Sequence, residues 1–198
     1  MDLTFQQFPK IPRYNRDIII TEKIDGTNAQ IHIIGVANPS DVLREDCERK
    51  GWAILDSAMS SWVMVPGSKN RYLNLKKDNY GFCKWVWENS EYLWDLGPGR
   101  HYGEWWGKGI QRNYGIDQKR FTLFNPHYAT KDFHTAPVLY EGPNDQLAIE
   151  ECLYNLSTHG SVLVKGFMKP EGIIIFHTAA NRTFKITLEN DEIPKGMQ

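Results

Sequence analysis

The sequence has 198 residues, of which 41% are hydrophobic and 24% are charged, and its formal net charge is −1. This balance is that of a soluble globular protein with its own core, and it excludes a strongly basic nucleic-acid binder. No apolar run reaches the about 18 residues that cross a membrane, and the N-terminus lacks a secretion signal. The three cysteines are widely spaced and fit reduced thiols. We expect one cytoplasmic domain over residues 1–198, without membrane association.

The N-terminal residues 1–16 combine aromatic residues with Pro9 and Pro12. They predict an irregular segment packed against the domain and pinned by Phe8 and Ile11.

The β-branched run Asp17–Ile20 predicts a strand, and alternation over residues 29–34 predicts a second one. We expect the two strands to form a hairpin whose turn presents Lys23. Gly26 would supply a positive φ and allow close approach to a ligand. A lysine in such a turn is usually an ordinary surface residue. A lysine that attacks a nucleotide phosphate must be unprotonated, and the phosphates need further cations and a metal.

Beyond residue 36, a helix-like stretch over residues 41–50 predicts an insertion on the surface. The turn that follows the next strand carries two cations, Lys69 and Arg71. We prefer Arg71 as a phosphate ligand, because a guanidinium grips phosphate through two parallel hydrogen bonds.

The apolar spacing from residue 82 to residue 96 predicts one amphipathic helix. Glu104 follows, placed between a glycine and two tryptophans at the expected end of a strand. A carboxylate there would be poorly hydrated unless it is paired, which makes it a candidate functional residue.

Residues 121–125 alternate aromatic and polar residues as an internal strand does. A helix is predicted over residues 144–159, with Asn144 as its N-cap.

Glu171 precedes a buried strand, and Lys185 lies on the next one. If the two strands pair antiparallel, both side chains would lie on the same face of the sheet.

In this order, the segments resemble the motifs of the covalent nucleotidyltransferases, which are ATP-dependent RNA ligases, DNA ligases and mRNA capping enzymes. The string Glu22–Asn28 is similar to motif I of the RNA ligase branch, with Lys23 as the nucleophile. Glu104, Glu171 and Lys185 match motifs III, IV and V, although Thr187 replaces the usual second lysine of motif V.

The resemblance implies an α+β nucleotidyltransferase (ATP-grasp-like ligase adenylylation) fold, with antiparallel sheets around a nucleotide pocket and helices packed outside. Relatives usually continue into a further domain, but only eleven residues follow Thr187, so we expect no OB-fold or other C-terminal domain here. It implies catalytic roles for Lys23, Glu104, Glu171 and Lys185, with Glu171 as the metal ligand. The implied nucleotide-binding residues are Glu22, Lys23, Ile24, Asn28, Arg71, Glu104, Phe124 and Lys185. Phe124 is the ring implied to stack on the adenine, and Phe121 is the alternative.

The activity implied is that of an RNA repair ligase that uses ATP and Mg²⁺ or Mn²⁺ to join the 5′-phosphate and 3′-hydroxyl ends of RNA, including nicked RNA duplexes. A minimal DNA ligase, a capping-type guanylyltransferase and a non-catalytic nucleic-acid-binding relative are the alternatives. The sequence leaves open whether an accessory protein or a second copy of the chain takes part.

Overall fold

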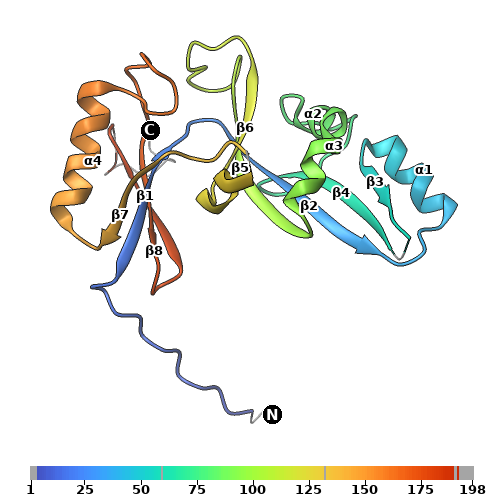
Figure 1. Ribbon diagram of the computed structural model, residues 1–198, viewed down its shortest axis with the longest axis horizontal. Coiled ribbons are helices and arrows are strands. Elements are labelled where there is room, and N and C mark those ends of the chain that lie inside the picture. The colour runs from blue at the N-terminus through green and yellow to red at the C-terminus, as the bar shows by residue number, and fades with distance from the viewer. Residues whose placement is uncertain (1–3, 59, 132, 190, 192–198) are drawn as a thin grey trace. The chain divides into compact units, whose positions relative to one another are not determined.

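The computed structural model describes residues 4–58, 60–131, 133–189 and 191. Contacts divide the chain into two compact units (Figure 1). The first unit combines the described residues up to Lys23 with those from Pro137 onward, and the second comprises Ile24–Ala136. The chain passes from the first unit to the second directly after Lys23.

The first unit contains a four-stranded antiparallel sheet in the order β7-β1-β8-β9. Its elements are β1 (Asp17–Lys23), β7 (Val138–Pro143), α4 (Gln146–His159), β8 (Gly172–His177) and β9 (Arg182–Thr187).

Helix α4 covers one face of this sheet (Figure 1). Ile149 and Leu156 of the helix pack against Ile20 and Ile173 of the strands. The helix begins later than expected, because the side chain of Asp145 is the N-cap and accepts a hydrogen bond from Leu147 N at 3.0 Å. Asn144 instead joins the N-terminal segment, donating to the carbonyl of Tyr14 at 3.2 Å.

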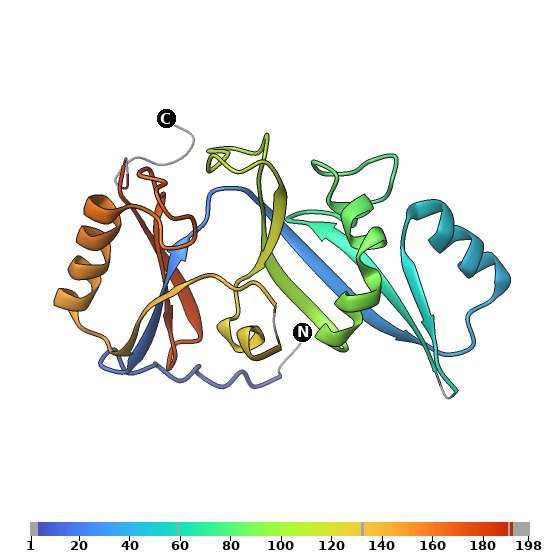
Figure 2. The same cartoon turned by 45° about the horizontal axis from the view of Figure 1, so that its top comes forward.

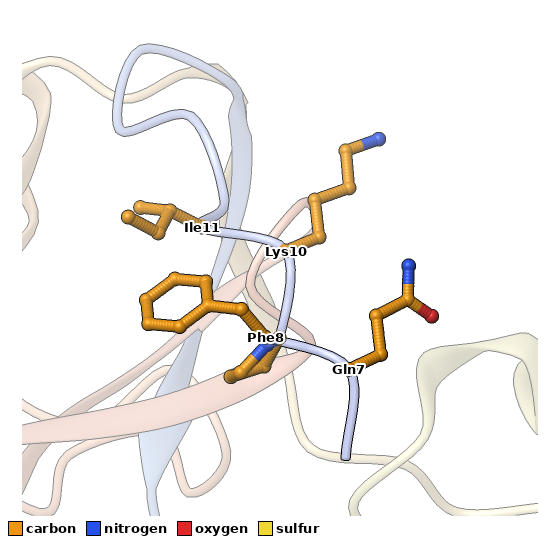
Figure 3. Close-up of a pocket in the computed structure, with 5 residues that line it drawn as sticks. Gln7, Phe8, Lys10 and Ile11 are labelled. Carbon is orange, nitrogen blue, oxygen red and sulfur yellow. The ribbon is translucent and has the colours of Figure 1, made fainter. Parts of the chain in front are cut away.

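The N-terminal segment does not pack as predicted. Phe8 and Ile11 are 78% and 75% exposed. Figure 3 shows these two side chains on one side of the segment, with Gln7 and Lys10 on the other. The hollow in Figure 3 is lined by residues 7–11 alone and includes none of the predicted site residues. Prolines lack a backbone donor, which keeps this part of the chain from joining the sheet.

The second unit contains a five-stranded antiparallel sheet in the order β3-β4-β2-β5-β6. Its elements are β2 (Thr27–Val36), α1 (Asp41–Lys50), β3 (Ala53–Asp56), β4 (Ser61–Ser68), α2 (Phe82–Glu88), α3 (Ser90–Leu93), η1 (Trp94–Leu96), β5 (Gly99–Gly107), β6 (Lys119–Leu123) and η2 (Pro126–Lys131).

The two faces of this sheet are covered differently. Ile31, Met64 and Trp105 face a core that α2 and α3 complete with Phe82 and Leu93. On the other face α1 packs beside β3 (Figure 2), where its buried Cys47 meets Val63 and Val65 of β4. The segment predicted to be a surface insertion therefore supplies a covering helix and an edge strand.

The single helix predicted over residues 82–96 is broken. Asn89 has φ −113° and ψ 13°, outside the helical region, and separates α2 from α3. The apolar spacing survives the break, since Phe82, Leu93 and Leu96 all face the core. Periodicity alone therefore predicted the buried face correctly and the continuity of the helix wrongly.

The predicted hairpin around Lys23 is also wrong. Strand β1 pairs with β7 and β8, whereas β2 pairs with β4 and β5. A β-branched run predicted β1 and alternation predicted β2, but the partners of both strands come from distant parts of the chain. The stretch between them connects two sheets.

Candidate active site

Lys23 is the last residue of β1, where its partner across the ladder is Gly172 of β8. Its Nζ donates to the carboxylate of Glu171, the residue just before β8. The lysine and glutamate side chains are 16% and 9% exposed, so this ion pair is largely shielded from water. The ion pair therefore fixes the position of the Lys23 side chain at the end of β1.

Lys185 lies on the same face of the sheet as Lys23. It pairs with Ile174, which pairs with Thr21, two residues before the lysine. Directly paired residues of an antiparallel sheet share a face, and residues two apart on a strand do so as well. Thr187 lies on the same face, but its hydroxyl makes a hydrogen bond within the next turn, where it donates to Glu189 O at 2.9 Å.

Glu22 points to the opposite face of β1 and is 1% exposed. Its carboxylate accepts hydrogen bonds from Ser161 Oγ at 2.5 Å, Val162 N at 2.8 Å and Leu163 N at 3.0 Å. Its side chain therefore holds the loop after α4, in a position set by the alternation of the strand.

In the second unit, Glu104 organises the stretch that follows Lys23. It lies in the middle of β5, not at a strand end as predicted, and is 7% exposed. Its carboxylate accepts hydrogen bonds from Gly26 N and from Asn28 Nδ2, both at 3.1 Å. Asn28 is its cross-strand partner on β2. The expectation that this carboxylate must be paired is thus met by two residues of motif I.

Gly26 serves close packing, not the positive φ that was predicted, since its φ is not positive. A Cβ at this position would lie 2.5 Å from the carbonyl oxygen of Trp105 and 2.8 Å from Cβ of Trp106. Only glycine lets the backbone pass so close to β5. Ile24, two residues earlier, is buried at 5% exposure.

Two further residues anchor the same stretch and were not singled out from the sequence. The Tyr114 hydroxyl accepts a hydrogen bond from Asp25 N at 2.8 Å, and Arg112 Nε donates to Asp25 Oδ2 at 3.0 Å. The glycine-rich run from Gly107 to Gly115 was the available signal. Gln111, Asn113 and Tyr114 have φ between 44° and 62° there, an uncommon conformation for residues other than glycine.

Arg71 follows β4, and its side chain is exposed. Its guanidinium donates to Lys77 O at 2.6 Å, which closes the loop between them. The remaining donors of the fork can receive an anion.

Phe124 and Phe121 differ sharply in burial. Phe121 is 6% exposed and packs in the core against Phe82 and Trp85, with ring centroids 5.1 and 6.0 Å away. Phe124 is 41% exposed and follows the end of β6. A core ring has no face to offer a base, so of the two only Phe124 can stack on a ligand.

The carboxylate of Glu171 is the predicted metal ligand. Within the described residues, no three His, Cys, Asp or Glu side chains gather into a metal-binding group. Mg²⁺ is commonly held by one or two carboxylates together with substrate phosphates, so the Glu171 carboxylate fits a metal that arrives with a nucleotide. No helix in the described part of the chain has the length and apolar character to cross a membrane.

The predicted residues thus form two groups. Lys23, Glu171 and Lys185 lie together on one face of the four-stranded sheet of the first unit. The second unit positions Asn28, Arg71, Glu104 and Phe124 around the five-stranded sheet.

Comparison with solved structures shows the class of fold. A Naegleria gruberi RNA ligase variant with ATP and Mn is similar at a TM-score of 0.58 and 16% identity, over 89% of this chain and 51% of that one. A variant of the same ligase with AMP and Mn has a TM-score of 0.55 and 16% sequence identity, over 88% of this chain and 50% of that one. The structure of that ligase with PPi has a TM-score of 0.54 and 16% sequence identity, over 87% of this chain and 50% of that one.

The chain therefore has the nucleotidyltransferase fold of these RNA ligases, with the predicted antiparallel sheets and packed helices. It spans about half the length of the structures that it matches. No protein-family model matches the sequence, and no curated protein matches it either.

Proposed function

We propose that this chain is the adenylyl-transferring domain of an ATP-dependent RNA ligase that joins 5′-phosphate and 3′-hydroxyl ends. The observation that carries the proposal is Lys23. The residue ends a strand, is shielded from water, contacts Glu171, and shares a sheet face with Lys185. The likeness in fold to an RNA ligase supports the same assignment.

In the first step, the Nζ of Lys23 attacks the α-phosphorus of ATP. A nitrogen–phosphorus bond forms, the bond from the α-phosphorus to the bridging oxygen breaks, and pyrophosphate leaves. Lys185 and Arg71 provide positive charge for the phosphates, and Phe124 stacks on the adenine. Glu104 keeps Gly26 and Asn28 fixed directly after the nucleophile.

In the second step, a 5′-phosphate oxygen of RNA attacks the phosphorus of lysyl-AMP, which frees Lys23 and leaves AMP on the RNA end. In the third, a 3′-hydroxyl attacks the 5′-phosphorus of that end and AMP departs. Each step is a displacement at phosphorus, so positioning and charge compensation matter more than proton transfer.

Glu171 would hold the Mg²⁺ or Mn²⁺. Bound there, a divalent cation would neutralise phosphate charge.

The test is formation of lysyl-AMP from ATP labelled at the α-phosphate, followed by peptide mass spectrometry. We expect a metal-dependent adduct at Lys23, abolished by chelation and by Lys23→Arg. Arginine retains the charge but does not deprotonate to a nucleophile. Arg71→Ala, Glu104→Ala and Lys185→Ala should each slow adduct formation.

An adduct on another residue, or wild-type labelling in Lys23→Arg, would reject the proposal. Sealing assays on matched RNA and DNA nicks then decide the substrate. Sealing of DNA alone would favour the minimal DNA ligase, and no labelling under any metal would favour a non-catalytic relative.

A further inference from the structure

The five-stranded sheet of the second unit has a polar stretch on the face turned away from its Ile31 core. Three cross-strand pairs of β2 and β5 lie there: His32 with Arg100, Gln30 with Tyr102, and Asn28 with Glu104. The residues between them on β2, such as Ile31 at 0% exposure, point into the core. The same face therefore runs from Glu104 to Arg100, four residues along β5, or about 13 Å.

Tyr72 lies on this stretch, with its ring held in place but accessible. Its hydroxyl is 2.8 Å from His32 Nδ1, and the two rings stack with centroids 6.2 Å apart and an interplanar angle of 18°. The indole of Trp52 meets the Tyr72 ring edge-on, with the ring centroids 6.1 Å apart. Tyr72 is nevertheless 41% exposed, and Tyr102 is 53% exposed. Aromatic rings that are oriented in advance and open to solvent suit stacking with a planar ligand.

The positive charge on this stretch is carried by Arg100. Its guanidinium carbon lies 5.9 Å from the Tyr72 ring centroid, and its Nη1 donates to Gln30 at 3.3 Å. Among the described residues, no carboxylate forms an ion pair with Arg100. Burial first, then Arg100 and His101, lower the pKa of His32, so its ring is neutral near pH 7. The guanidinium is therefore the charge that a ligand over Tyr72 would meet.

We propose that this face, defined by Tyr72, Arg100 and Tyr102, binds a single-stranded segment of RNA. Bases would stack on the two tyrosine rings, and the guanidinium would meet a phosphate, as in surfaces that bind single strands without reading their sequence. An apolar protein partner fits less well, because covering Arg100 would leave the remaining N–H donors of its guanidinium without water or an acceptor. The choice of RNA over DNA rests on the proposed function.

The test uses a fluorescent RNA of about twelve nucleotides with a 5′-hydroxyl and a blocked 3′ end, without ATP, so that no reaction occurs. Anisotropy titrations at low salt should show binding by the wild type. Tyr72→Leu keeps apolar contact with Trp52 but removes the stacking face, and Arg100→Gln removes the charge. Each should weaken binding by about fivefold or more, the effect of losing one stacked base. Arg100→Lys, which keeps charge without the planar fork, should fall between.

The matched control is Tyr154→Leu, which replaces a 64% exposed tyrosine on α4 and should bind as the wild type does. Thermal melting of each variant shows whether it is folded. Absence of binding by the wild type, or equal binding by folded Tyr72→Leu and Arg100→Gln, overturns the strand site. Equally tight binding of the DNA version overturns the choice of RNA.

Lysyl-AMP formation, measured on the same preparations, separates this inference from the proposed function. Weak RNA binding with wild-type adduct formation in Tyr72→Leu supports the strand site. Tyrosine-dependent RNA binding by a wild type that forms no adduct rejects the ligase assignment and retains the strand site.

Discussion

At the scale of single residues, two phenylalanines of one aromatic stretch should have separable roles. Phe124→Ala should weaken ATP binding by about 1–3 kcal/mol, the range for stacking on a base, with little change in stability. Phe121→Ala should instead lower the free energy of unfolding by about 3–5 kcal/mol, because it opens a cavity beside Phe82 and Trp85. Nucleotide titration and urea denaturation of both variants measure the two effects.

The comparison has a clear contrary outcome. If Phe121→Ala stays stable and loses nucleotide affinity while Phe124→Ala behaves as the wild type, the assignment of the stacking ring is reversed.

At the scale of elements, the close approach of the Gly26 backbone to β5 predicts a steric effect. Gly26→Ala places a Cβ against the Trp105 carbonyl, which cannot move without disturbing the sheet, so we expect a loss of about 1–3 kcal/mol. Gly35→Ala is the matched control, since its added Cβ would meet only the ring of Trp62 at 3.2 Å. Thermal melting compares the two, and equal stability of both variants would contradict the packing role of Gly26.

The loop after α4 depends on Glu22 in a way that two substitutions distinguish. Glu22→Ala leaves the N–H groups of Val162 and Leu163 without their acceptor, at a cost of about 1–3 kcal/mol. Glu22→Gln retains an oxygen for these donors and an amide that can donate to Ser161, so its cost should be smaller. Chemical denaturation gives both values. An equal cost for both would show that the charge, not the hydrogen bonds, is what matters.

At the scale of the whole molecule, all three thiols should be unreactive in the folded protein. Cys47, Cys83 and Cys152 are buried, and burial raises the pKa of each, that of Cys83 to about 12. Only the thiolate is nucleophilic, so a disulfide reagent near pH 8 should label none of them until the chain unfolds. Absorbance assays in buffer and in denaturant measure this. Rapid labelling of one thiol in buffer would show that a buried segment opens readily.

The sequence by itself determined several of the strands and helices and which residue types bear the chemistry. A β-branched run placed β1, alternation placed β2, and Glu104 was recognised as a carboxylate that must be paired in its surroundings. The spacing of apolar residues predicted α4 to within two residues of its start. These features are local, because alternation, caps and hydration depend on neighbours along the chain.

Only the tertiary structure decided which of these residues contact each other and which strands pair. Lys23 contacts Glu171 across 148 positions, and Asn28 contacts Glu104 across 76. The same separation in sequence explains why β1 and β2, adjacent along the chain, belong to different sheets. Packing of Phe82 and Trp85 against Phe121 likewise decided that Phe121, and not Phe124, is a core residue. A strand's periodicity gives its two faces but not its neighbours, since pairing is settled by packing between segments that are distant along the chain.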